Sequence, residues 1–153
     1  MAERRGFQYV LEPVQRKCDW DLQDAMLALG ELNQAETAAG QRLGALQQQV
    51  QQVRGDWARQ LQQGQLNLEL QRLTHAFLEQ LAQRIDALQA QLERLRQRRA
   101  QVLEQARTLR GLADQLGRHR REALRGHERA VAEAGYRAAD DLWLQRSHWR
   151  KQA

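Results

Sequence analysis

Apolar residues in the second half of this chain recur with spacings that alternate between three and four residues. They are Leu78, Leu81, Ile85, Leu88, Leu92, Leu95, Val102, Ala106, Leu109, Ala113 and Leu116. A sustained 3.5-residue period is typical of a helix that buries one narrow seam against another helix, rather than a broad face against a globular core. The sequence therefore predicts a coiled coil, a fold with few concave pockets that could surround a substrate.

The composition is that expected of long helices. Gln, Leu, Arg, Ala and Glu dominate the 153 residues, aromatic residues make up 5%, and there is a single proline. No run of β-branched residues is bounded by turn residues, so no strands are expected. No stretch approaches the roughly 18 apolar residues of a membrane span, so we expect no direct membrane insertion. The single cysteine, Cys18, is expected to be a buried thiol in a reducing, cytoplasmic environment.

The first half of the chain has heptads of its own. The expected seam has Leu22, Leu29, Glu36, Leu43, Val50 and Trp57 at a, with Cys18, Ala25, Leu32, Ala39, Leu46 and Val53 at d. Only Glu36 interrupts its apolar character. Because a helix tolerates proline in its first turn, Pro13 places the start of the first helix at about residues 8 to 13. We expect this helix to span about 8–60.

Between the two heptad stretches the phase is lost, over residues 61–74, and Gly64 lies there between glutamines. Asn67 is a candidate cap for the next helix. A short connector between two long helices predicts an antiparallel hairpin. The expected fold is all-α: a long antiparallel two-helix coiled coil in one domain, 1–153, with a turn at about 61–66, a second helix at about 67–148 and a C-terminal helix overhang.

Glu36 and Arg99 are predicted to meet across the seam. Pairing Trp57 with Leu78 in an antiparallel hairpin brings these two a positions to about the same height. A charged pair in a seam lowers stability, but it fixes the register of the two helices. We therefore expect Glu36 and Arg99 to set the register of the hairpin.

The last roughly 25 residues of the second helix are expected to project beyond their partner, since the second helix is the longer one. After Leu116 the seam weakens to small and polar residues. Large apolar residues nevertheless follow it, namely Tyr136, Leu142, Trp143, Leu144 and Trp149. A partner protein that buries them is one explanation. The alternative is that they cap the end of the hairpin against Phe7, Tyr9 and Val10.

The net charge of +5 is unevenly distributed along the chain. Residues 94–125 carry 10 basic and 3 acidic side chains. We call seven of these arginines the basic band: Arg94, Arg96, Arg98, Arg110, Arg118, Arg121 and Arg125. A solvated helix face and a nucleic-acid-binding surface both fit such a band. The arginines point around the helix and no aromatic residues accompany them, so nucleic acid is not the expected partner.

Nothing in the sequence suggests catalysis. The histidines His75, His119, His127 and His148 are not accompanied by a set of metal-ligand residues at suitable spacing. Asp140 and Asp141 are adjacent, so on a helix their carboxylates point in different directions. No glycine-rich phosphate loop is present. We expect no catalytic residues, no bound metal and no cofactor, and hence no enzyme.

Three short motifs occur in a characteristic order. The chain opens with Leu11-Glu12-Pro13-Val14 and Gln15-Arg16-Lys17-Cys18-Asp19, continues with Gly64 and Phe77-Leu78-Glu79-Gln80-Leu81, and ends with Asp140-Asp141-Leu142, Gln145-Arg146 and Trp149-Arg150-Lys151. This order resembles the central stalk of bacterial type III export machines, the flagellar FliJ and injectisome YscO-like family. The resemblance spans nearly the whole chain. The basic band and the Trp-rich end differ from the flagellar pattern and favour a virulence injectisome.

The resemblance implies a non-enzymatic stalk that is cytoplasmic and peripheral at the inner-membrane secretion apparatus. Its partners would be the hexameric secretion ATPase, whose hydrolysis it promotes or couples, and the cytoplasmic domain of the export gate, with export chaperones as a further class. The implied ATPase-binding residues are Leu142, Trp143, Arg146, Trp149 and Arg150, and the implied gate-binding residues are Phe77, Leu78 and Leu81. The alternatives are a generic coiled-coil scaffold, an export-chaperone escort, or a nucleic-acid-binding coiled coil.

Overall fold

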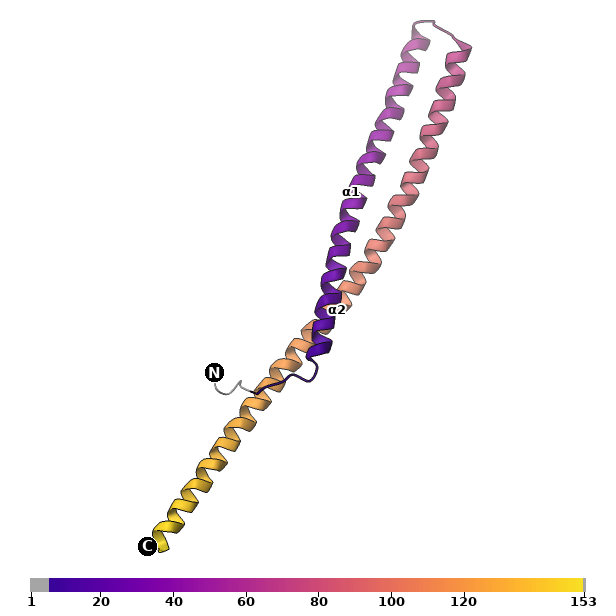
Figure 1. Ribbon diagram of the computed structural model, residues 1–153. Helices are drawn as coiled ribbons and strands as arrows, with labels where there is room; N and C mark the ends of the chain where they lie inside the picture. Colours follow the sequence, from indigo (N-terminus) through magenta and orange to yellow (C-terminus); the bar gives the residue numbers. More distant parts are fainter. Residues whose placement is uncertain (1–5, 153) are drawn as a thin grey trace. The chain divides into compact units, whose positions relative to one another are not determined.

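The computed structural model describes residues 6–152, which form two α-helices (Figure 1). Helix α1 spans Glu12–Gln62 and helix α2 spans Leu68–Gln152. The predicted fold class is confirmed: residues 6–152 contain no strand, and the two helices pack against each other as a helical hairpin. Helix α1 begins within the expected range of residues 8 to 13, and α2 continues a few residues beyond the expected residue 148.

Both helix starts follow from local chemistry. Pro13 occupies the first turn of α1, where its missing N–H leaves no helical hydrogen bond unmade. At the start of α2, Asn67 caps the helix, because its Oδ1 accepts hydrogen bonds from the backbone N–H groups of Glu69 at 3.0 Å and Leu70 at 3.4 Å. The cap expected from the sequence is therefore present.

The turn between the helices is built around Gly64. Its φ of +73° lies in the left-handed region that favours glycine. The N–H of Gln65 donates to the carbonyl oxygen of Gln60 at 3.2 Å, and the N–H of Gly64 donates to that of Leu61 at 3.2 Å. This pair of hydrogen bonds is a Schellman motif, which satisfies the last carbonyl groups of α1 and ends the helix.

The chain divides into two compact units, each containing part of both helices. One unit, residues 24–106, is the antiparallel hairpin closed by the turn at Gly64. Ala39, Leu88 and Leu92 form its buried cluster, with Leu43, Leu46 and Leu95 packed against it. Leu81, Val102 and Ala106 are also buried. All nine are a or d positions of the predicted heptads, so the seam that the sequence predicted is the seam that forms.

The other unit comprises residues 1–23 and 107–153, of which residues 6–23 and 107–152 are described. Here the start of α1 and the segment before it pack on α2. The buried Cys18 has its Sγ 3.3 Å from the carbonyl oxygen of Leu109, to which it donates. Tyr9 is buried too, and its hydroxyl lies 3.3 Å from the carbonyl oxygen of Leu116 and 2.9 Å from Nδ1 of His119. The segment before α1 is thus held on α2 by a specific polar contact.

Candidate functional site

The C-terminal segment, defined as residues 129–152 of α2, is a single helix with an exposed apolar surface. Every residue from Arg129 to Lys151 is exposed except Ser147. The large apolar side chains among them are Val131, Tyr136, Leu142, Trp143, Leu144 and Trp149. Trp143 is 68% exposed and Trp149 is 77% exposed. Exposed tryptophans grouped on one helix are typical of a surface that binds another protein.

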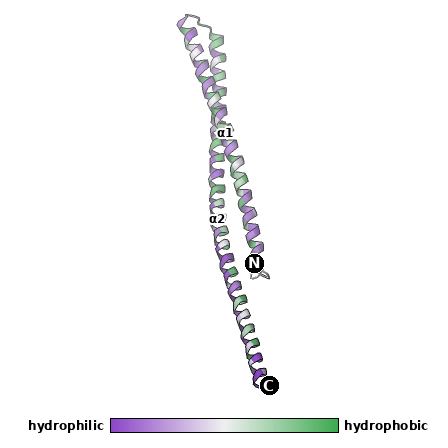
Figure 2. Cartoon of the chain, turned by 90° about the vertical axis from the view of Figure 1, so that its left-hand side faces the viewer, coloured by the Kyte–Doolittle hydropathy of each residue, from purple (hydrophilic) through white to green (hydrophobic). Residues whose placement is uncertain are grey.

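The apolar face of this segment is not a continuation of the hairpin seam. Within this segment the positions that continue the seam are Ala130, Ala134, Arg137, Asp141, Leu144 and His148, of which Leu144 is the only large apolar residue. The residues that directly follow these positions are Val131, Gly135, Ala138, Leu142, Gln145 and Trp149, and they form a stripe in which only Gln145 is polar. One residue corresponds to about 100° around a helix, so this apolar face is rotated by about that angle from the seam. Figure 2 shows hydrophobic and hydrophilic residues alternating along this end of α2.

The proposal that the N-terminal aromatic residues cap these side chains is wrong. Phe7 contacts His127, with 5.6 Å between the ring centroids, and Tyr9 contacts His119. Val10 is 89% exposed and covers nothing. These contacts lie earlier on α2 than the C-terminal segment, because the segment before α1 follows the weakened seam and not the apolar face. The tryptophans consequently remain free to meet a partner.

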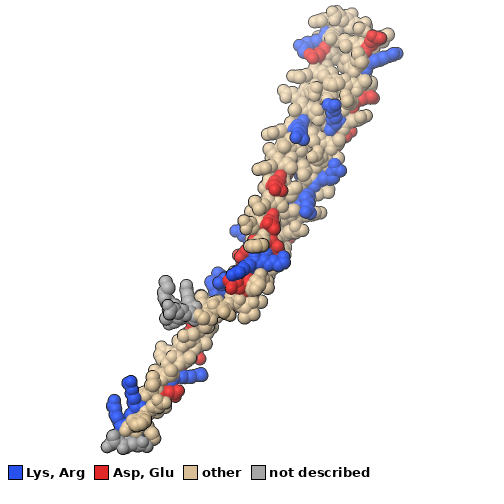
Figure 3. Space-filling view, in the orientation of Figure 1, with Lys and Arg blue, Asp and Glu red and all other residues tan. Residues whose placement is uncertain are grey.

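Basic side chains accompany the apolar face at its end. Arg146 and Arg150 are four residues apart and lie on the same side of the helix as Leu142 and Trp143. Both arginines are exposed, as is Lys151. Figure 3 shows basic side chains gathered near the C-terminal end of α2. The five residues expected to bind the ATPase, namely Leu142, Trp143, Arg146, Trp149 and Arg150, therefore share one helix and one exposed surface.

The three residues expected to bind the export gate do not form one surface. Leu81 is only 1% exposed and belongs to the seam, while Leu78 is partly buried. Phe77 is 36% exposed and is the member of the three best placed to meet a partner. The sequence did not single out the exposed leucines near the turn, which are Leu61, Leu66, Leu68, Leu70 and Leu73. Their signal in the sequence was the run of leucines that departs from the heptad phase.

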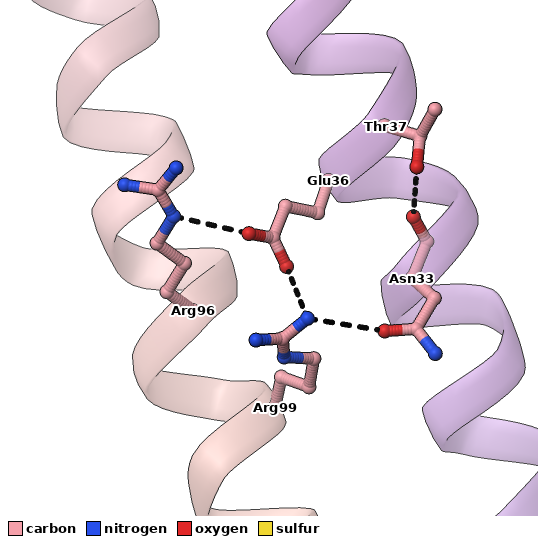
Figure 4. Close-up of polar contacts among 5 residues, drawn as sticks. All are labelled: Asn33, Glu36, Thr37, Arg96 and Arg99. Atoms are coloured by element: carbon pink, nitrogen blue, oxygen red, sulfur yellow. Dashed lines mark hydrogen bonds and ion pairs between the residues drawn. The ribbon is translucent and has the colours of Figure 1, made fainter.

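The predicted pairing of Glu36 with Arg99 is present, and Arg96 joins it (Figure 4). Glu36 Oε2 lies 3.0 Å from Arg99 Nη1, and its Oε1 accepts a hydrogen bond from Arg96 Nε at 3.0 Å. Arg99 also approaches the side-chain oxygen of Asn33, at 3.4 Å. The Glu36 side chain is 18% exposed, so its charge is largely withdrawn from water and is balanced by two guanidinium groups.

The basic band is exposed but does not act as one group. Its members Arg94, Arg96, Arg98, Arg110, Arg118, Arg121 and Arg125 are all exposed residues of α2. They belong to two different compact units, and Arg96 is engaged by Glu36. Arg120 lies next to the band and is also engaged, because it donates to Oε1 of Gln15 at 3.0 Å and lies over the Tyr9 ring. Arginines near the helix interface thus serve partly to join α1 to α2.

Residues 6–152 contain neither a candidate metal site nor a candidate membrane-spanning helix. No group of three or more His, Cys, Asp or Glu side chains is arranged there to hold a metal ion. Over the same residues, no helix combines the length and the apolar character that crossing a membrane requires.

The comparisons with known proteins give no match to this chain, whether with family models, curated protein sequences or solved structures.

Proposed function

We propose that this protein is a non-enzymatic central stalk of a bacterial type III secretion system. In this role it binds the hexameric secretion ATPase through the C-terminal segment, promotes or couples ATP hydrolysis, and links the ATPase to the export gate through residues near the turn. A stiff helix pair that contacts successive subunits of a ring can bias each nucleotide site differently, so it needs no catalytic residue of its own.

The observation that supports the proposal is the exposed face of the C-terminal segment. It presents Leu142, Trp143 and Trp149 beside Arg146 and Arg150, and nothing among the described residues covers it. Tryptophan and arginine are the residues most enriched among the anchors of protein interfaces. A surface of this kind on the longer helix is what a stalk inserted into a ring requires.

The test is a binding measurement with a hexameric type III secretion ATPase. Trp143→Ala combined with Trp149→Ala is expected to weaken binding by at least about tenfold per anchor, because each buried aromatic anchor contributes about 2 kcal/mol or more. Trp20→Ala is a matched control, since Trp20 is 74% exposed but lies on α1. Circular dichroism should show that all variants keep their helix content.

The outcome also separates the alternatives. If the protein binds the ATPase and stimulates its turnover, and the double variant loses both effects, the stalk function holds. If it binds no secretion ATPase, a generic scaffold or a chaperone escort is the better description. Salt-dependent binding to nucleic acid that is lost when arginines of the basic band are neutralised would instead favour the nucleic-acid alternative.

A further inference from the structure

A groove runs between α1 and α2 within the unit formed by residues 24–106. Its volume is about 630 Å³. Its apolar residues are Ala45 and Leu46 of α1 and Ala87 and Leu88 of α2. Leu88 is buried and Leu46 is partly buried, whereas both alanines are exposed. The groove therefore has an apolar floor, and its small side chains leave room for another chain to approach both helices closely.

Three arginines line the same groove, namely Arg42 of α1 and Arg84 and Arg94 of α2. Within residues 6–152, no hydrogen bond or ion pair engages the side chain of any of the three. The two arginines of the Glu36 layer differ in this respect, since both are paired. The other polar residues of the groove are glutamines, so every charge that lines it is positive.

The sequence explains why these arginines have no partner within the chain. Side chains on a helix meet those that lie three or four residues away. Around Arg42 these positions hold only alanine and leucine, and around Arg84 they hold only glutamine, alanine and leucine. Around Arg94 they hold alanine, glutamine and Arg98, which adds a like charge. The three positive charges therefore lack a carboxylate that an outside molecule could supply.

We propose that this groove binds an acidic amphipathic helix of a partner protein. An apolar ridge of that helix packs on Leu46 and Leu88, and carboxylates beside the ridge pair with Arg42, Arg84 and Arg94. Packing of an amphipathic helix into a groove is a recurrent mode of protein recognition. Arginine suits carboxylates because its guanidinium group donates two parallel hydrogen bonds to them.

An acidic helix fits the groove better than the other occupants that a basic groove suggests. None of the residues that line it is aromatic, so the bases of a nucleic acid would have nothing to stack on. A membrane presents a broad surface, which does not enter a groove between two helices. The same groove of a second copy presents the same three arginines, and like charges oppose such a pairing. An acidic helix matches the apolar floor and the positive charges together.

This inference does not depend on the proposed function. The residues of the groove lie between Arg42 and Arg94, whereas the ATPase is proposed to bind the C-terminal segment, which belongs to the other compact unit. The two surfaces share no residue, so each can be tested with variants that leave the other intact. The hairpin would then carry a docking site of its own for a second partner.

The first test measures the binding of a defined peptide to the full chain by fluorescence anisotropy. The probe is a synthetic helix of three heptads with Leu at a and d and Glu at e and g, and the reference peptide has Lys in place of every Glu. We expect the acidic peptide to bind at least about tenfold more tightly than the basic one, and to bind more weakly as salt is raised. Equal binding of the two peptides would overturn the proposal.

The second test reverses charges in the groove. Arg42→Glu combined with Arg94→Glu should weaken binding of the acidic peptide by at least about tenfold, and this variant should bind the basic peptide more tightly than the unsubstituted chain does. Arg54→Glu combined with Arg72→Glu is the matched control, because it makes the same charge change on the same two helices at exposed positions outside the groove. Circular dichroism verifies that both variants remain helical. If the control weakens binding equally, the attraction reflects net charge alone and the proposal is wrong.

The third test locates the peptide without changing any charge. Ala87→Trp should fill the groove and weaken binding of the acidic peptide by at least about tenfold. Ala82→Trp is the matched control, since Ala82 is also an exposed residue of α2 and lies about 140° around the helix from Ala87. A peptide that binds the Ala87→Trp variant as tightly as it binds the unsubstituted chain lies elsewhere, and the proposal then fails.

Two further measurements identify a different occupant. Single-stranded DNA that displaces the acidic peptide, and loses affinity in the Arg42→Glu, Arg94→Glu variant, would assign the groove to nucleic acid. A dimer of the chain alone that forms in sedimentation equilibrium and is lost in the Ala87→Trp variant would assign it to a second copy. Either result would overturn the proposal of an acidic helix.

Discussion

Glu36 and Arg99 face each other across the helix pair, with 3.0 Å between Oε2 and Nη1. Arg96 lies 3.0 Å from the other carboxylate oxygen. One acid thus faces two bases, and this imbalance determines how charge reversals at this layer should behave.

Arg99→Glu should destabilise residues 24–106, because it places two carboxylates together at a half-buried position and leaves only Arg96 opposite. We expect a loss of about 1–3 kcal/mol in the free energy of unfolding, measured by urea denaturation. Adding Glu36→Arg should restore only part of this loss, since Arg96 then faces a like charge. The triple variant that also carries Arg96→Glu should recover more. Arg98→Glu, at an exposed position of the same helix, serves as the control.

Leu81→Ala should strongly destabilise the hairpin, because Leu81 is only 1% exposed. Removing a buried leucine side chain costs about 2–5 kcal/mol. Leu73→Ala is the same chemical change on the same helix at a residue that is 69% exposed, and it should change stability by no more than about 0.5 kcal/mol. Equal effects of the two substitutions on the urea midpoint would contradict the assignment of Leu81 to the seam.

Tyr9→Phe should loosen the segment before α1 without unfolding the hairpin. It removes the hydroxyl that contacts the Leu116 carbonyl oxygen and His119, and a hydrogen bond of this kind contributes about 1 kcal/mol. Hydrogen exchange should quicken at residues 13–23 and 107–120 and stay unchanged in residues 30–100. Val10→Ala, at an exposed neighbouring position, should leave both regions as they are.

The thiol of Cys18 should make stability depend on alkaline pH. Burial raises its pKa above the ordinary value of 9.0, and the nearby charges of Asp19 and Asp21 raise it further. Up to about pH 8 the thiol is almost wholly neutral in both the folded and unfolded states, so the full stability is present. Above that pH the unfolded thiol ionises first, and stability falls until the folded thiol ionises as well.

Cys18→Ala tests this assignment. The variant should be somewhat less stable at every pH, because a buried side chain is shortened. It should not show the additional fall in stability between about pH 8 and about pH 10 that ionisation of the thiol causes in the unsubstituted protein. Urea midpoints measured for both proteins at the two pH values give the comparison. An identical decline in both proteins would mean that other groups, such as tyrosines, are responsible.

Periodic features were the ones that the sequence allowed us to predict. The 3.5-residue repeat is a geometric requirement of helix pairing, so it located the seam, the turn at Gly64 and the contact between Glu36 and Arg99. Arg96 was assigned to the basic band and not to this contact, although it occupies an e position. Such positions flank the seam, and a long arginine side chain can reach across it from there.

Non-periodic features could not be predicted in the same way. The contact of Tyr9 with Leu116 joins residues 107 positions apart, and no repeat links them. Leu81 was placed in a binding site because the motif that contains it resembles a family, but its burial follows from the seam. The exposed face with Trp143 and Trp149 was predictable, because large apolar residues continued where the seam positions had become polar.

The reversal of the chain at Gly64 gives every layer of the helix pair its own loop length. Arg96 meets Glu36 across 60 residues, whereas Leu116 meets Tyr9 across 107 residues. Forming the Tyr9 contact directly costs less than about 1 kcal/mol more in loop-closure entropy than forming the Glu36 contact directly. Once the layers nearer the turn have formed, however, each further layer closes a loop of only a few additional residues. The contacts between the helices should therefore form first near Gly64, and local unfolding should begin at Tyr9. The contacts of the N-terminal residues can then be exchanged for those of another protein while the layers around Leu81 and Leu88 stay closed.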